Sequence, residues 1–66
     1  MQVTVNGAPA ELADGSTVAE LVAVRSRGHD RVAVALNGDV VPRTSWAQTP
    51  LSAGDNVEVL APTAGG

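Results

Sequence analysis

The stretch that decides the fold is residues 1–12, which read MQVTVNGAPAEL. Apolar and polar residues alternate through its first positions, with the period of a strand that buries one face. Asn6-Gly7 then favours a type I′ turn, because both residues accept a positive φ. A second strand around residues 10–12 should therefore run back beside the first. Pro9 has no N–H to donate, so we place this second strand at an edge of the sheet.

The segment after the hairpin has the pattern of a helix. Thr17 is a good N-cap, and Glu20, three residues later, completes a capping box. Three apolar residues are spaced to form one stripe facing the sheet, namely Val18, Leu21 and Val22. We expect a helix of two to three turns, with Gly28 as its left-handed cap.

Alternation and turn residues predict three further strands, at residues 32–36, 40–41 and 56–61. Asn37-Gly38 is the tight turn between the first two. Residues 43–50 should be irregular, with a single helical turn around Trp46. In the last strand, Val57, Val59 and Ala61 should point inward and Glu58 and Leu60 outward.

The predicted order is strand, strand, helix and three strands, which is an α+β chain. A helix that connects two strands of one sheet favours a right-handed crossover. The last strand is expected beside the first and parallel to it, with the helix packed across a mixed sheet of about five strands. This is the ubiquitin-like, or β-grasp, arrangement. We divide the chain into a domain at 1–61 and a flexible tail at 62–66.

Composition excludes several classes of function. The chain has 66 residues, no cysteine and a net charge of −3. Without cysteine it has no disulfide or thiol nucleophile, and we expect no metal and no cofactor. Without a basic patch it should not bind nucleic acid. The sequence also shows neither a signal peptide nor an apolar run of the roughly 20 residues that cross a membrane, so a cytoplasmic protein is expected.

The chemistry is expected at the C-terminal residues Pro62-Thr63-Ala64-Gly65-Gly66. Glycine has no Cβ, so such an end can enter a narrow active-site channel. If ATP converts the Gly66 carboxylate to an acyl-adenylate, a persulfide or sulfide can attack it and leave a thiocarboxylate. In this interpretation Gly66 carries sulfur, and Gly65 and Ala64 pass into the active site of a partner. The alternative is a frayed terminus without function.

A docking surface is predicted on the outward face of the sheet. Ala33, Ala35 and Leu60 should lie together there, next to Thr4. A small contiguous apolar patch beside a functional tail would suit transient docking of a partner, although an ordinary sheet face is the alternative.

Three further residues could have roles of their own, namely His29, Trp46 and Arg43. His29 is the only histidine and has no partners that would make it a metal ligand or general base, so we interpret it as a solvated loop residue. Trp46 is interpreted as structural, covering one end of a core without another aromatic residue. Arg43 is either a partner contact or an ordinary surface arginine.

Five segments of the sequence match one known family, namely residues 1–7, 17–21, 32–43 with Trp46, 51–59 and 65–66. Over essentially its whole length the sequence thus resembles the ThiS family, the sulfur carriers of thiamine biosynthesis. The Val-Pro-Arg-x-x-Trp run at 41–46 points to the thiamine branch. The Gly-Asp turn at 54–55 and the Gly-Gly end are shared with other β-grasp carriers.

The resemblance implies a cycle in which this chain is a co-substrate and not an enzyme. A ubiquitin-activating-like enzyme would adenylate Gly66, a persulfide protein would supply sulfur, and a thiazole synthase would take the sulfur into the thiazole ring of thiamine. Two alternatives stay open. Pro62 is shared with the carriers of molybdopterin synthesis, and a ubiquitin-like interaction module would never have its tail activated. We do not expect an enzyme, since the sequence shows no nucleophile–base pair and no P-loop.

Overall fold

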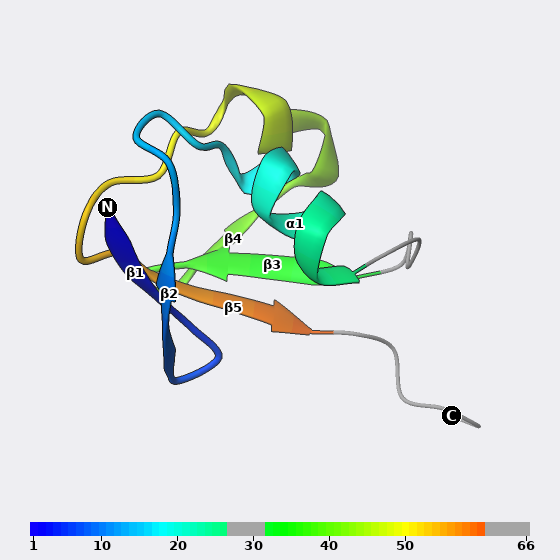
Figure 1. Ribbon diagram of the computed structural model, residues 1–66. Helices are drawn as coiled ribbons and strands as arrows, with labels where there is room; N and C mark the ends of the chain where they lie inside the picture. The colour runs from blue at the N-terminus through cyan, green and yellow to red at the C-terminus, as the bar shows by residue number, and fades with distance from the viewer. Residues whose placement is uncertain (27–31, 61–66) are drawn as a thin grey trace.

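The computed structural model describes residues 1–26 and 32–60 of the protein. These residues form a five-stranded sheet, one α-helix and one 3₁₀-helix (Figure 1). The elements are β1 (Gln2–Val5), β2 (Ala8–Glu11), α1 (Val18–Ser26), β3 (Ala33–Leu36), β4 (Asp39–Val41), η1 (Arg43–Gln48) and β5 (Asn56–Leu60).

The strand order is β2-β1-β5-β3-β4. β5 lies at the centre, parallel to β1 and antiparallel to β3, whereas the β1–β2 and β3–β4 pairs are antiparallel hairpins. α1 and η1 lie on the same side of this sheet, and none of the described elements covers its other face, which we call the open face (Figure 1). The predicted β-grasp architecture is therefore confirmed, including the parallel pairing of the first and last strands.

Both hairpins turn through an Asn-Gly pair with positive φ. Asn6 and Gly7 have φ values of 51° and 83°, and Asn37 and Gly38 have values of 51° and 89°. These angles give the predicted type I′ turns. Because a two-residue turn pairs Val5 directly with Ala8, β2 starts two residues earlier than the predicted 10–12. The predicted edge position of β2 is confirmed.

The capping box forms at the start of α1. The Thr17 backbone N–H donates to Glu20 Oε1 at 2.8 Å, and the Glu20 N–H donates to Thr17 Oγ1 at 3.3 Å. The helix makes about two and a half turns. The predicted apolar stripe is buried and consists of Val18, Leu21 and Val22. The predicted cap at Gly28 lies outside the described residues.

The core lies between the open sheet and the two helices. Its buried residues are Val3, Val5, Val18, Leu21, Val22, Val32, Val34, Trp46, Leu51 and Val57. As predicted, the odd positions of β5 point inward and the even ones outward: Val57 is buried and Val59 half-buried, whereas Glu58 and Leu60 are exposed. The predicted inward position of Ala61 lies outside the described residues.

The prediction of an irregular segment at 43–50 is wrong in part. Residues Arg43–Gln48 form a continuous 3₁₀-helix, longer than the single expected turn. The cause of the longer helix is tertiary packing. Trp46 is buried in the core, and the segment after η1 is tied to the start of α1, where the Val18 N–H donates to the Thr49 carbonyl at 3.0 Å.

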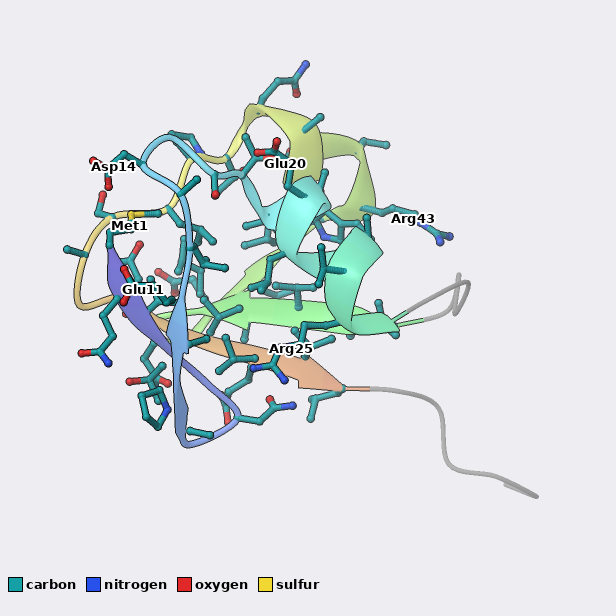
Figure 2. All side chains as sticks on the ribbon, in the orientation of Figure 1. Met1, Glu11, Asp14, Glu20, Arg25 and Arg43 are labelled. Carbon is teal, nitrogen blue, oxygen red and sulfur yellow. The ribbon has the colours of Figure 1, made fainter. Side chains whose placement is uncertain are left out.

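The Met1 amino group links the two strands of the β1–β2 hairpin at the end opposite its turn. It donates to the Leu12 carbonyl at 2.7 Å and lies 3.0 Å from Glu11 Oε2 and 3.4 Å from Asp14 Oδ1. Figure 2 shows Met1, Glu11 and Asp14 together at one end of the molecule. The hydrogen bond to Glu11 is the main reason that the pKa of this amine is raised above its ordinary value of 8.0; burial opposes the increase, and Asp14 adds to it.

This raised pKa predicts a loss of stability in alkali. The folded state holds the amine proton more tightly, so the contribution is complete below pH 8 and disappears as the pH rises through the folded-state pKa. The sequence has no lysine, tyrosine or cysteine, and therefore no other group that titrates between the amine and arginine. Chemical denaturation between pH 7 and pH 11 should show a decline that is absent after acetylation of the amine. If the free energy of unfolding declined equally in the unmodified and the acetylated protein, a group other than the Met1 amine would be responsible.

Candidate functional site

The candidate site lies where β5 ends. Leu60 is the last described residue, and the predicted sulfur-carrying Gly66 follows six positions later in the sequence. Gly66, Gly65 and Ala64 all lie outside the described residues, so their assigned roles stay predictions. The structure does show the framework to which this segment is attached.

β5 is hydrogen-bonded to a neighbouring strand on each side. On one side, the Thr4 N–H donates to the Asp55 carbonyl at 2.8 Å and the Asn6 N–H to the Val57 carbonyl at 2.9 Å. On the other side, its residues pair with β3 from Leu36 to Ala33, the last pair being Ala33 and Leu60. The chain thus leaves the domain from the central strand and not from a loose edge, which gives its last residues a fixed origin.

The predicted docking residues do come together on the open face of the sheet. Ala33 lies directly opposite Leu60, and Ala35 lies opposite Glu58 on the same face. Directly opposite residues on neighbouring strands have their Cβ atoms close together. Thr4 shares this face but pairs with Asn56, at the other end of β5. Thr4 therefore lies at the far end of the face from Leu60, and its predicted position next to the docking residues is wrong.

Sequence reasoning missed one member of this group. Val40 in β4 is opposite Ala35, and its exposed fraction of 76% is larger than the 60% of Leu60. The signal was present in the sequence, because a two-residue turn at 37–38 pairs residue 40 with residue 35. We call Ala33, Ala35, Val40 and Leu60 the outer patch. Glu58, opposite Ala35, adds an exposed carboxylate to the same face.

The Val-Pro-Arg-x-x-Trp run has a structural explanation. The Trp46 indole Nε1–H donates to the Val41 carbonyl at 2.9 Å, so the ring both fills the core and occupies an acceptor of the edge strand β4. The predicted structural role of Trp46 is confirmed. The Arg43 guanidinium carbon lies 5.5 Å from the centre of the Trp46 ring, within the range of a cation–π interaction. Figure 2 shows Arg43 extending outward from η1.

Within residues 1–26 and 32–60 no three His, Asp or Glu side chains are grouped closely enough to hold a metal ion. His29 lies outside the described residues. In the same two stretches, no helix is long and apolar enough to cross a membrane. The described part of the chain offers a five-stranded sheet with the outer patch on one face, and residues 61–66 follow its central strand in the sequence.

Comparison with known proteins gives a consistent result. A model of the ThiS family matches residues 3–66. The sulfur carrier protein ThiS of Escherichia coli strain K12 is 35% identical over 66 residues, with both chains covered completely. The chain is also similar to the crystal structure of the thiamine biosynthesis protein ThiS from Geobacter metallireducens. That match covers both chains completely, with a TM-score of 0.82 and 36% identity. A solution structure of a thiamine biosynthesis protein from that organism has a TM-score of 0.80 and 38% identity, covering all of this chain and 88% of the other.

Proposed function

Because this chain belongs to the ThiS family, we propose that it is a sulfur carrier in thiamine biosynthesis and that Gly66 carries the sulfur. One observation carries the proposal. The match to the family model extends through residue 66 and so includes the positions of the Gly-Gly end. In the sequence, that end begins five positions after Leu60, the last residue of the central strand β5.

The chemistry requires only the terminal carboxylate from this chain. A carboxylate oxygen of Gly66 attacks the α-phosphorus of ATP, forming an acyl-adenylate and releasing pyrophosphate. The terminal sulfur of a protein persulfide attacks the acyl carbon and displaces AMP. A second thiol then cleaves the acyl disulfide, which leaves a thiocarboxylate on Gly66 and a disulfide on the donor. The adenylating enzyme supplies the active site, and this chain is its co-substrate.

The partners follow from that cycle. They are a ubiquitin-activating-like adenylating enzyme, a persulfide-bearing sulfur donor and a thiazole synthase that consumes the thiocarboxylate. The two similar solved structures are named as thiamine biosynthesis proteins, which favours this client over molybdopterin synthesis. We further propose that the cycle operates in the cytoplasm.

The outer patch is the surface we propose for docking the adenylating enzyme. Gly66 is six positions after Leu60, so a fully extended tail reaches about 20 Å from the patch. An enzyme that binds the patch therefore holds the tail within reach of an active site about that far away. Leu60 is 60% exposed on this face, and its side chain can be buried by a partner without any rearrangement of the sheet.

The proposed function is tested by the intact mass of the protein after incubation with ATP, a persulfide donor, a reducing thiol and the adenylating enzyme of the same organism. The expected result is a gain that corresponds to the replacement of one oxygen by sulfur. Omitting ATP should prevent it. If the mass does not change under any of these conditions, the chain is a β-grasp interaction module and not a sulfur carrier.

A further inference from the structure

The two strands at the centre of the sheet have unequal lengths. β1 ends at Val5, which is paired with Val57, but β5 continues to Leu60. The last backbone bond between them runs from the Asn6 N–H to the Val57 carbonyl. In a parallel pair, the next groups of β5 that face β1 are the N–H and C=O of Val59. The chain has already turned away at Asn6, so the backbone of β1 offers no partner for them.

The side chain of Asn6 takes the place of the missing strand. Its Oδ1 accepts the Val59 N–H at 2.8 Å, and its Nδ2 donates to the Val59 carbonyl at 3.1 Å. If β1 had continued, the partners of Val59 would have been the carbonyl of residue 6 and the N–H of residue 8. One side-chain amide therefore reproduces both bonds of a peptide and extends the ladder to the end of β5.

Among the residues that suit this turn, asparagine alone can make both bonds. Position 6 has a φ of 51°, which favours asparagine, aspartate or glycine. Glycine has no side chain, and an ionised aspartate only accepts hydrogen bonds. Asparagine both tolerates the backbone angle and provides a donor together with an acceptor.

We propose that Asn6 is a positioning residue for the reaction of Gly66. This inference rests on the proposed function. Val59 lies one residue before the end of the described strand and seven before Gly66. By holding both polar groups of the Val59 backbone, Asn6 fixes the point and direction in which the chain leaves the sheet. Reaction at the Gly66 carboxylate requires alignment to within about an ångström, so this origin affects the rate of the chemical step.

The chain contains a matched control for this role. Asn37 has the same φ of 51°, the same following glycine and the same turn type. Its Oδ1 accepts the Asn56 N–H at 2.9 Å and its Nδ2 donates to Asp55 Oδ1 at 3.1 Å, so it holds the beginning of β5 and not the end. Asn6→Gly and Asn37→Gly remove the same chemical groups from equivalent turns, and glycine retains the positive φ in both.

The experiment compares the two variants with the wild type as substrates of the adenylating enzyme, measuring kcat and KM for thiocarboxylate formation. Asn6→Gly should lower kcat about tenfold, with KM within about twofold, because the outer patch is unchanged. Asn37→Gly should stay within about twofold of the wild type in both constants. The Val59 amide should exchange its hydrogen about tenfold faster in Asn6→Gly only. Asn6→Asp should not restore kcat, since a carboxylate cannot donate to the Val59 carbonyl.

Equal kinetics for the two glycine variants would overturn the positioning role while leaving the proposed function intact. An unchanged exchange rate at Val59 would also overturn it, because the amide would then not hold the strand end. If the wild type itself gains no sulfur, the proposed function fails and the positioning role fails with it.

Discussion

Deletion of Gly66 is expected to lower the rate of thiocarboxylate formation by more than about 100-fold. The shortened chain still ends in a carboxylate, that of Gly65, but its reach is about 3.5 Å shorter. The acyl carbon would then lie outside the position that the partner's active site requires. Ala64 would also become the penultimate residue, and its Cβ would enter a channel that accepts glycine. Intact mass after the complete reaction measures the loss.

The same deletion should leave folding and docking unchanged. The core and every hydrogen bond described above lie within residues 1–60, so the midpoint of thermal unfolding should equal that of the wild type. The shortened chain should compete with the wild type for the adenylating enzyme, with an inhibition constant close to the wild-type KM, because the outer patch is intact. Normal conversion of the shortened chain would show that the sulfur is not carried on Gly66.

Much of the fold could be predicted because its signals are local. The Asn-Gly pairs at 6–7 and 37–38 determine two hairpins, and the Thr17–Glu20 capping box marks the start of the helix. The extent of η1 could not be predicted in this way. It depends on the burial of Trp46 and on the bond from its indole to the Val41 carbonyl, which are products of tertiary packing.

The same distinction between local signals and tertiary contacts applies to the candidate site. The period of two, together with the strand order, places Ala33, Ala35 and Leu60 on one face, as predicted. Val40 joins this face through the pairing across the 37–38 turn, which places it opposite Ala35, and the alternation of apolar residues alone does not show this pairing. The bond between Asn6 and Val59 spans 53 residues of sequence. Asn6 has an obvious local role as a turn residue, so nothing in the sequence pattern pointed to a second, long-range role.

The second large effect is expected from Leu60→Gln, which should raise the KM of the adenylating enzyme about 30-fold. Burial of a leucine side chain at an interface stabilises the complex by about 2 kcal/mol, and each 1.4 kcal/mol corresponds to a factor of ten. Glutamine has a similar length but loses most of this contribution. The value of kcat at saturating carrier should remain within about twofold, because the tail and its origin are unchanged.

Val24→Gln is the control for this substitution. Val24 is 74% exposed, but it lies on α1, which covers the opposite face of the sheet from Leu60. If the outer patch is the docking surface, Val24→Gln should leave KM within about twofold of the wild type. Equal increases in KM for both variants would indicate a general effect of polarity, and no increase for Leu60→Gln would exclude the patch. Asn6→Gly should change kcat, whereas Leu60→Gln should change KM. Together these variants test whether neighbouring residues at the end of β5 have different roles: Leu60 binds the partner, and Val59 sets the direction of the tail.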